Sequence, residues 1–400
     1  MKSILYISYD GLTDPLGQSQ ILPYLIGLSK LGYQFHVISF EKENRFNELK
    51  SKIEGLCTTN QINWVPLKYS KRPPIFSTLF DVFRMKKKAF QLHEKNQFQI
   101  IHCRSYISAL IGLSLKRKGL KFIFDMRGFW IEERVEGRIW NLKNPIYKLI
   151  YKYFKRKEKA FLLQADQIIT LTNKAKSYLL ENKIVQSESK ISVIPCCMDE
   201  TLFDPSLIEC NQKSELMRHL GITNDDLVLG YVGSIGTWYM LAEMFDCFKV
   251  ISEKNQNLKF LIVTKDSKKH ILNEAKKKEI SLEKIIITSC SHQNIPIHIA
   301  LFNLSIFFIR PSFSKMASSP TKQGELMAMN IPIICNSGVG DTDEIIQSNN
   351  AGIILSELNN DAYDRINLHS LKGSHFREGA IAYFGLNNGI ANYKKAYDSC

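Results

Sequence analysis

Three cationic residues, a run of hydroxyl residues and a glutamate follow one strongly apolar segment of this 400-residue sequence. The cations are Arg310, Lys315 and Lys322, and the acid is Glu325. Ser319-Pro320-Thr321 is typical of a first helical turn, whose free backbone N–H groups attract anions. A lysine in that turn opposes the helix dipole unless an anion is bound. The pattern predicts a cradle for two phosphates, with Glu325 accepting hydrogen bonds from a ribose. A basic loop capped by a solvated glutamate is the alternative.

Two further Gly-rich loops could contact the same ligand. The first follows the apolar run 227–232, and its small residues suit the close approach of a diphosphate. We expect contacts there from Ser234, Gly236 and Thr237, and a tight structural turn is the alternative. In the second loop, Gly338 and Gly340 could present backbone N–H groups to a sugar, while Asp341 or Asp343 caps the next helix.

The first half of the chain carries weaker candidates. The apolar run 3–9 leads into a turn with Gly17 and Gln18, where a helix N-terminus could face an anion. No Gly-x-Gly-x-x-Gly occurs there, which disfavours a nicotinamide or flavin dinucleotide. Arg127 follows another strand and stays protonated, so we expect it to bind an acceptor or donor anion rather than act as a base. A structural network with Asp125 and other nearby acids is the alternative, and His102 at a strand end is expected to be packed.

Short apolar segments alternate with helical patterns along the whole chain, which predicts parallel sheets built from βαβ units. The expected strands are 3–9, 34–40, 62–66, 99–103, 121–125, 167–171, 191–194, 227–232, 258–263, 284–288, 304–309, 331–335 and 352–355. The expected helices of the first half are 18–31, 76–95, 106–118, 146–164 and 173–182. The alternation breaks near 195–205.

This pattern predicts an α/β protein with two Rossmann-like doubly wound domains that face a central cleft. The first domain would span residues 1–198 and the second residues 199–372. A C-terminal helix, 373–400, would pack back on the first domain.

Composition narrows the partners and the location. The net charge of +14 favours anionic partners, but no basic tract interleaved with aromatics resembles a nucleic-acid module, so we expect no nucleic acid. The nine scattered cysteines lack zinc spacing and are expected to be reduced thiols, with no metal site. Because no apolar run reaches the ~20 residues needed to span a bilayer, a cytoplasmic protein is expected.

One segment indicates contact with an anionic membrane. Residues 144–159 combine aromatic side chains with six Lys or Arg, and Lys86, Lys87 and Lys88 add a second basic cluster. Amphipathic basic helices can lie on anionic lipid, where lipid-linked acceptors reside. The inner face of the cell membrane is therefore a candidate location. An ordinary helix with a solvated basic face is the alternative.

Glu325-Leu326-Met327-Ala328-Met329 and the Pro-bearing run 331–334 resemble the second half of the Glu-x7-Glu motif of glycosyltransferase family 4. The resemblance covers nearly the whole chain and is strongest over 227–355. It implies a retaining hexosyltransferase with the GT-B fold that moves sugar from a nucleotide-diphosphate sugar, here a UDP-sugar, to a glycan or lipid-linked acceptor. The resemblance also implies that residues 1–198 bind the acceptor and residues 199–372 the nucleotide sugar, in cell-surface polysaccharide or glycoconjugate synthesis. Since no Asp-x-Asp-like pair ends a strand, we expect a metal-independent reaction with no cofactor beyond the donor.

Two departures from the family pattern affect the site. Position 317, where the first motif Glu would fall, is Ala, and residues 234–240 lack the family's cations. We therefore expect Arg310, Lys315 and Lys322 to neutralise the departing diphosphate, with Arg127 near the place of a family His. A sugar-nucleotide epimerase of the same fold and a non-catalytic sugar-nucleotide-binding protein remain open alternatives.

Overall fold

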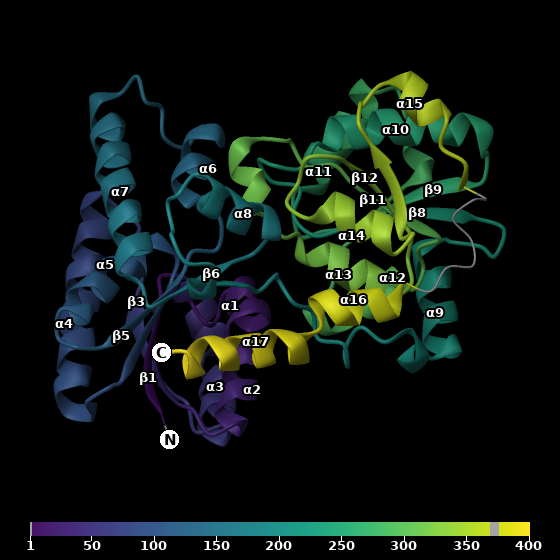
Figure 1. Cartoon of the computed structure of the whole chain (residues 1–400). Helices are drawn as coiled ribbons and strands as arrows, with labels where there is room; N and C mark the ends of the chain where they lie inside the picture. Colours follow the sequence, from purple (N-terminus) through teal and green to yellow (C-terminus); the bar gives the residue numbers. More distant parts are fainter. Residues whose placement is uncertain (1, 369–375) are drawn as a thin grey trace. The chain divides into compact units, whose positions relative to one another are not determined.

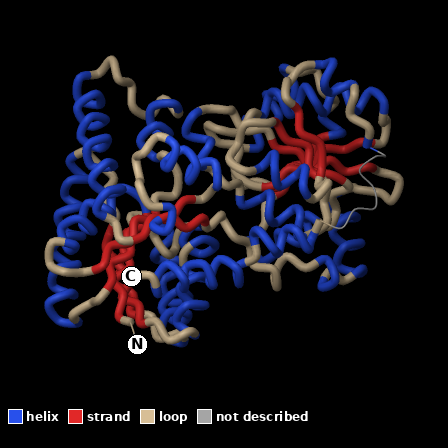
Figure 2. The backbone as a smooth tube through the Cα atoms, viewed as in Figure 1, coloured by secondary structure: helices blue, strands red, loops and turns tan. Residues whose placement is uncertain are grey.

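The computed structural model describes residues 2–368 and 376–400, and the chain divides into two compact units. The first unit comprises Met1–Cys196, Met316–Ser318 and Leu386–Cys400, and the second comprises Cys197–Lys315 and Ser319–Gly385. Each unit is built around one parallel sheet with helices packed against it (Figures 1 and 2). The expected limit at 372–373 between the second domain and the C-terminal helix lies outside the described residues.

The sheet of the first unit has seven parallel strands in the order β3-β2-β1-β4-β5-β6-β7. Its central strands are apolar on both faces, because helices cover both sides of the sheet. The strands are β1 (Ser3–Ser8), β2 (Gln34–Glu41), β3 (Asn63–Lys68), β4 (Ile100–Arg104), β5 (Lys121–Asp125), β6 (Gln167–Thr170) and β7 (Ile191–Val193).

The helices of the first unit cover this sheet, with α5 contacting β4 and β5 and flanked by α4 and α7 (Figure 1). On another part of the unit, α17 packs against α2. The helices are α1 (Pro15–Gln20), α2 (Leu22–Lys30), α3 (Glu43–Thr59), α4 (Phe76–Asn96), α5 (Ser105–Lys116), α6 (Trp130–Glu136), α7 (Pro145–Gln164), α8 (Asn173–Glu181) and α17 (Leu386–Asp398). The expected helix 18–31 is in fact two helices, α1 and α2.

The second unit repeats the plan with six strands in the order β10-β9-β8-β11-β12-β13. The strands are β8 (Leu227–Val232), β9 (Leu258–Val263), β10 (Ile285–Thr288), β11 (Leu304–Phe307), β12 (Ile333–Asn336) and β13 (Gly352–Leu355). The helices are α9 (Cys210–Leu220), α10 (Leu241–Lys254), α11 (Lys268–Lys277), α12 (Ile295–Ile299), α13 (Thr321–Ala328), α14 (Thr342–Ser348), α15 (Asn360–Asp364) and α16 (Arg377–Phe384).

The C-terminal segment contains two helices rather than one. The helix α16 contacts α13 inside the second unit, and α17 belongs to the first unit. Gly324 permits the close approach of α13 and α16, since an added Cβ would lie 2.8 Å from Cβ of Phe384. The GT-B fold expected from the sequence is therefore present, with its last helix in the first unit.

Candidate functional site

The second unit has its topological switch point between β8 and β11, which are neighbours in the sheet but not in the chain. Ligands of open α/β sheets bind beyond the carboxyl ends of the strands at such a point. The two loops that leave these strands are hydrogen-bonded to each other: Met240 N donates to Phe308 O (2.9 Å), and Arg310 N donates to Trp238 O (2.9 Å). The loops that follow β8 and β11, which are far apart in the sequence, therefore lie side by side in the structure.

Lys322 lies at the centre of this arrangement. Its ammonium Nζ is 3.9 Å from the ring centroid of Tyr231 and 3.8 Å from that of Tyr239. A Cβ on Gly233, whose φ is +112°, would lie 3.2 Å from the same Nζ, so the glycine lets the amine reach the loop after β8. The side chain is buried, and within the described residues Nζ makes no hydrogen bond.

The surroundings of Lys322 are unfavourable for a positive charge. Burial drives the pKa of Lys322 well below its usual value, and the charge of Glu325 opposes this shift only in part. Buried charges in proteins are normally paired, because an unpaired one loses its hydration without replacement. Aromatic faces attract the ammonium but leave its three N–H donors unused. An anion bound beside Gly233 would supply the missing acceptor.

The other two expected cations contact one indole ring. The guanidinium carbon Cζ of Arg310 lies 4.9 Å from the ring centroid of Trp238, and Nζ of Lys315 lies 3.8 Å from it. Lys315 is buried, whereas Arg310 is partly exposed. The structure therefore brings Arg310, Lys315 and Lys322 to the same two loops, each resting on an aromatic ring.

The loop after β8 is fixed by a carboxylate. Asp266 Oδ2 accepts hydrogen bonds from the Ser234 hydroxyl (2.9 Å) and from the backbone N of Ile235, and the N of Gly236 donates to Ser234 Oγ (3.3 Å). Thr237 is exposed at the tip of the loop. Of the three residues expected to contact the ligand, Ser234 uses its hydroxyl to stabilise the loop, whereas Gly236 and Thr237 are exposed.

The helix α13 begins at Thr321, after Pro320 as its N-cap, and the proline side chain makes no capping hydrogen bond to the first turn. Ser319 directly precedes this start. Glu325, one turn further, is largely buried, and its Oε1 lies 3.7 Å from Nε2 of the half-exposed His292. The geometry leaves the uncapped N–H groups of the helix and a carboxylate within one turn of each other, as a phosphate and a ribose of one nucleotide would need.

The Gly-rich loop after β12 uses its N–H groups internally. Gly338, at φ +88°, donates from N to Asp343 Oδ2 (3.2 Å), and Gly340, at φ +46°, donates to the carbonyl of Lys315 (2.8 Å). Asp341 occupies the N-cap of α14, but its side chain makes no capping hydrogen bond and accepts one from the Tyr383 hydroxyl (2.7 Å). Capping by the side chain of Asp341 was therefore a wrong expectation, because the tyrosine competes for its carboxylate.

In the first unit, Gly17 and Gln18 lie in α1 and contact the turn that precedes this helix. A Cβ on Gly17 would lie 2.0 Å from a backbone oxygen of the preceding turn, and Gln18 Nε2 donates to Thr13 O (3.1 Å). The backbone N atoms of Leu12 and Thr13 donate to the buried carboxylate of Glu41 (2.8 and 3.1 Å). A protein carboxylate thus occupies the anion-binding groups of this turn.

Arg127 lies two residues beyond β5 with φ +52°, a strained conformation for a residue with a side chain. Its Nη2 contacts Cys196 Sγ (3.2 Å), and its Nη1 lies 4.0 Å from Asp125 Oδ1. Nη1 is buried and has no hydrogen-bond partner among the described residues. Both the pairing with Asp125 and a capacity to bind an anion are therefore present.

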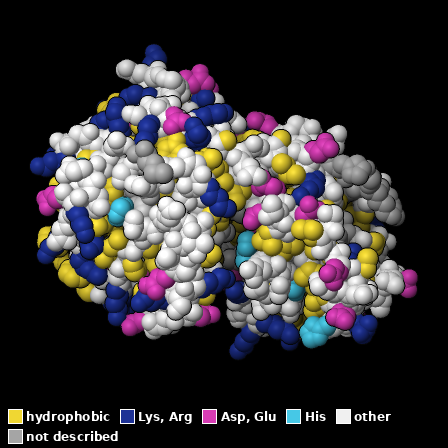
Figure 3. Space-filling view, turned by 90° about the horizontal axis from the view of Figure 1, so that it is seen from below, with side chains coloured by type: hydrophobic (Ala, Val, Ile, Leu, Met, Phe, Trp, Pro, Cys, Tyr) yellow, Lys and Arg dark blue, Asp and Glu magenta, His cyan; other side chains and the backbone are white. Residues whose placement is uncertain are grey.

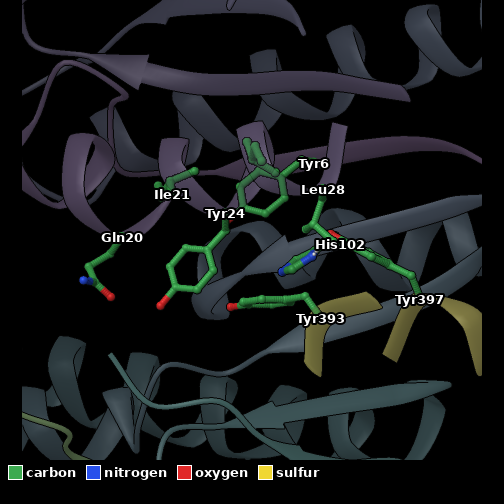
Figure 4. A pocket seen from close by; sticks show the side chains of 9 residues that line it. Tyr6, Gln20, Ile21, Tyr24, Leu28, His102, Tyr393 and Tyr397 are labelled. Atoms are coloured by element: carbon green, nitrogen blue, oxygen red, sulfur yellow. Dashed lines mark hydrogen bonds between the residues drawn. The ribbon is translucent and has the colours of Figure 1, made fainter. Parts of the chain in front are cut away.

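A small pocket lies beside this pair in the first unit, and Figure 4 shows the His102 ring among the tyrosines that line it. His102 Nδ1 lies 2.7 Å from the Tyr397 hydroxyl, and the Tyr393 hydroxyl donates to Asp125 Oδ2 (3.0 Å). Both tyrosines come from α17. The pocket residues are Tyr6, Gln20, Ile21, Tyr24, Leu25, Leu28, His102, Tyr393 and Tyr397.

Asp125 carries the negative charge of this network. Burial alone would raise the pKa of Asp125, but the positive charge of Arg127, together with His102 and Arg104, outweighs burial and lowers it. Burial lowers the pKa of His102, against the opposing hydrogen bond and charge of Asp125, which favours the neutral ring. His102 is packed, as expected, and holds Asp125 in place.

Sequence reasoning gave no role to Glu41, Asp266 or His292. Glu41 is the last residue of β2, Asp266 follows β9, and His292 follows β10. A polar residue just past the carboxyl end of a parallel strand was the signal that could have identified all three. Across residues 2–368 and 376–400, no group of three or more His, Cys, Asp or Glu is arranged to hold a metal ion. In the same residues, no helix has the length and apolar character to cross a membrane.

Two family models match successive parts of the chain. The model described as Glycosyltransferase Family 4 matches residues 24–202, and that described as Glycosyl transferases group 1 matches residues 212–377. A curated relative is the capsular polysaccharide biosynthesis glycosyltransferase CapM of Staphylococcus aureus, 22% identical over 207 residues. That match covers 51% of this chain and 52% of CapM, so it spans about half the length of the relative.

Solved structures share the fold over the whole chain. A glycosyltransferase from Rickettsia africae superposes with a TM-score of 0.71 at 17% identity, covering 100% of this chain and 98% of that one. The UDP-GlcNAc 2-epimerase from Neisseria meningitidis, solved with UDP-GlcNAc, gives 0.60 at 10% identity and covers 100% of both chains. Such low identities show the fold alone. The two family models together extend from residue 24 to residue 377, and the chain belongs to the group 1 glycosyltransferases of family 4.

Proposed function

We propose that this protein is a retaining glycosyltransferase that takes its sugar from a UDP-sugar held by the second unit. The acceptor is a glycan or a lipid-linked sugar, in the synthesis of cell-surface polysaccharide or glycoconjugate. The observation that carries the proposal is the buried ammonium of Lys322, which lies between two tyrosine rings beside Gly233 and lacks a hydrogen-bond acceptor within the described chain. A diphosphate is the ligand whose chemistry this amine fits.

The chemistry follows from where negative charge develops. When the bond between the sugar and the diphosphate breaks, charge accumulates on the leaving phosphate oxygens, and donors already aimed there lower the barrier. Lys322 supplies one cation from a site with little water, and Arg310 and Lys315 supply charge from the same pair of loops. The uncapped start of α13 adds backbone N–H groups. No metal ion is needed for this arrangement.

The donor's nucleoside would be oriented by Glu325. A carboxylate can accept hydrogen bonds from both hydroxyls of a ribose, and Nε2 of His292 lies 3.7 Å from Oε1 of Glu325. The N–H groups of Gly236, Gly338 and Gly340 already donate to Ser234, Asp343 and Lys315, so these glycines would give the donor sugar room for close approach rather than free N–H donors. Arg127 belongs to the first unit, where its permanent charge suits binding an anionic group of the acceptor or donor.

We also infer a cytoplasmic protein in peripheral contact with an anionic membrane, through the basic helix α7. Its residues 144–159 carry six Lys or Arg. Such contact would bring the enzyme to lipid-linked acceptors.

The test compares Lys322→Ala with Lys268→Ala, an exposed lysine of α11 chosen as the matched control. Each protein is incubated with labelled UDP-sugars, and transfer, donor hydrolysis and UDP affinity are measured. We expect Lys322→Ala to lose at least tenfold in both affinity and rate, and Lys268→Ala to match the wild type. A change within threefold, under ~1 kcal/mol, would show that Lys322 does not hold the diphosphate.

The same incubation separates the alternative activities. Isomerised donor without sugar transfer would identify an epimerase, and unchanged donor that nevertheless binds would identify a binding protein. Transfer or hydrolysis with the sugar released in its original anomeric form supports the proposal.

A further inference from the structure

An exposed apolar stripe runs along the first half of α4. Four large side chains at positions i, i+3, i+4 and i+7 share one face of the helix, as the helical repeat requires. Their exposed fractions are 71% for Phe76, 60% for Leu79, 56% for Phe80 and 64% for Phe83. Isolated apolar residues on a surface are ordinary, but a contiguous set of this kind marks an interaction site.

The same face turns basic further along the helix. Lys86 and Lys87 are the next exposed residues of α4, and Arg84 lies with its guanidinium carbon 5.5 Å from the Phe80 ring centroid. Asp81, the acidic residue between Phe80 and Arg84, is fully buried; it pairs with Arg84 (3.5 Å) and accepts hydrogen bonds from the Tyr9 hydroxyl and the Ser70 backbone. The exposed face of α4 from Phe76 to Lys87 therefore presents apolar groups and positive charge, with no exposed carboxylate.

The helix α7 repeats this combination in the same unit. Ile146, Leu149 and Tyr153 are exposed at spacings of three and four, with exposed fractions of 56%, 69% and 45%. Lys148, Lys152, Arg156 and Lys159 are exposed around them. The one acid of the helix, Glu158, is buried against Lys155 and the Tyr106 hydroxyl.

The two helices flank α5, which contacts both of them and the sheet. In Figure 1 they run along the outer side of the first unit, away from α2 and α17 of that unit. At the left-hand edge of Figure 3, where α4 lies, hydrophobic and basic side chains stand next to each other. Two amphipathic helix faces with the same chemistry therefore lie on one side of this sheet.

We infer that the exposed faces of α4 and α7 form a docking surface for an anionic lipid bilayer, with Phe76, Leu79, Phe80 and Phe83 inserted among the acyl chains. A bilayer fits better than a folded partner because the surface pairs rings that can enter the acyl boundary with lysines that reach back to lipid phosphates. Because α4 has no exposed acid between Phe76 and Lys87, no negative charge on this face repels anionic headgroups. The inference rests on the proposed peripheral membrane contact, and it is independent of the donor assignment.

The test is co-sedimentation of the full chain with vesicles of phosphatidylglycerol and phosphatidylcholine in equal parts, and with phosphatidylcholine alone. We expect binding to the anionic vesicles at low salt and weaker binding at high salt. The double variant Phe80→Ser/Phe83→Ser should bind about tenfold more weakly or worse. The pair Lys86→Ala/Lys87→Ala should show a similar loss at low salt.

The matched control is Leu31→Ser/Leu207→Ser, which removes two leucines that are 50% and 65% exposed elsewhere in the chain. It should bind vesicles like the wild type. Wild-type protein that ignores anionic vesicles, or a Phe80→Ser/Phe83→Ser variant that binds them fully, would overturn the inference. So would sedimentation equilibrium showing a wild-type dimer that the phenylalanine variant dissociates, since a second copy would then cover the stripe.

A parallel thermal-shift measurement with UDP keeps the two proposals apart. The phenylalanine variant should show the same UDP-induced rise in melting temperature as the wild type, which also demonstrates that it is folded. If the phenylalanine variant loses vesicle binding but keeps the UDP-induced rise in melting temperature, the change affects the docking surface alone. Absence of a UDP shift in the wild type would refute the donor assignment and leave the docking result standing.

Discussion

Replacing Lys322 by Met should make the protein more stable and its donor binding weaker, two effects of opposite sign from one change. Methionine has the same unbranched length as the lysine stem, and its sulfur packs well against aromatic rings. It can therefore occupy the space between Tyr231 and Tyr239 without a charge to desolvate.

The stability gain follows from the surroundings of the amine. Each unit by which burial lowers the pKa of Lys322 costs about 1.4 kcal/mol of folding free energy at pH values below the folded pKa. The contacts of the ammonium with the two tyrosine rings offset part of this destabilisation, by about 0.5–2 kcal/mol each. A net gain of about 1–3 kcal/mol in unfolding free energy is expected, which is roughly 2–12 °C in the melting temperature of a unit of this size.

The loss in binding comes from the same atom. Removing a charge-assisted hydrogen bond to a phosphate costs about 1.5–3 kcal/mol, so the dissociation constant of UDP should rise about 10- to 150-fold. Calorimetric titration measures the dissociation constant of UDP, and thermal unfolding monitored by circular dichroism measures the change in stability. Lys268→Met serves as the control, with stability within about 0.5 kcal/mol of the wild type and unchanged affinity.

The effect on stability also has a defined pH dependence. A lysine whose pKa is lowered by folding destabilises the protein at low pH, because the unfolded chain binds the proton more tightly. The advantage of Lys322→Met should therefore shrink as the pH rises from the folded pKa towards about 10.4, where the unfolded lysine also loses its proton. A variant that is less stable than the wild type by more than 1 kcal/mol, with UDP affinity within threefold, would refute the reasoning.

Three further predictions concern the supports of these sites. Gly233→Ala places a side chain at φ +112° against the Lys322 amine, so we expect a loss of about 1–3 kcal/mol in unfolding free energy together with weaker UDP binding, both measured as above. Asp266→Ala frees the loop after β8, and UDP affinity should fall severalfold with little change in melting temperature; unchanged affinity would show that the loop needs no such tether. Asp125→Asn leaves the Arg127 guanidinium buried without its carboxylate and should cost about 3–5 kcal/mol at pH 7. Because the folded pKa of Asp125 is lowered, its contribution is present above the unfolded pKa of about 3.9 and is lost as the pH falls through the folded value. The melting temperatures of variant and wild type should therefore converge at a pH below the folded pKa of Asp125.

The sequence predicted the sheets well because parallel strands are buried on both faces and appear as uninterrupted apolar runs. The strands 121–125, 227–232, 258–263 and 352–355 have the expected bounds. The helix α3 was not expected, because its apolar stripe is narrow: Ile53 and Cys57 are its buried residues, and most of the other side chains face water. A helix with so few core contacts leaves little periodic signal.

Local environment was less predictable than secondary structure. From sequence alone, a lysine is expected to be a solvated charge. Nothing near Lys322 in the chain indicates that aromatic rings of β8 and its loop, some 80 to 90 positions earlier, will cover it. Glu41 likewise looks like the end of a strand, yet it accepts hydrogen bonds from the N–H groups of Leu12 and Thr13, in the turn before α1. Such contacts depend on which strands become neighbours, and sheet order is a tertiary property.

The pattern of rings and cations explains how the site can work without positive charge in the loop after β8. Residues 234–240 contain no Lys or Arg, but they carry Trp238 and Tyr239, and these rings contact all three cations of the loop and helix after β11. A carboxylate in their place would hold the cations equally well, but it would also neutralise them and compete with a phosphate. An aromatic face attracts a cation without giving it a hydrogen-bond acceptor. Aromatic support therefore holds Lys322 in place while, within residues 2–368 and 376–400, its Nζ makes no hydrogen bond and is available to the diphosphate that we propose.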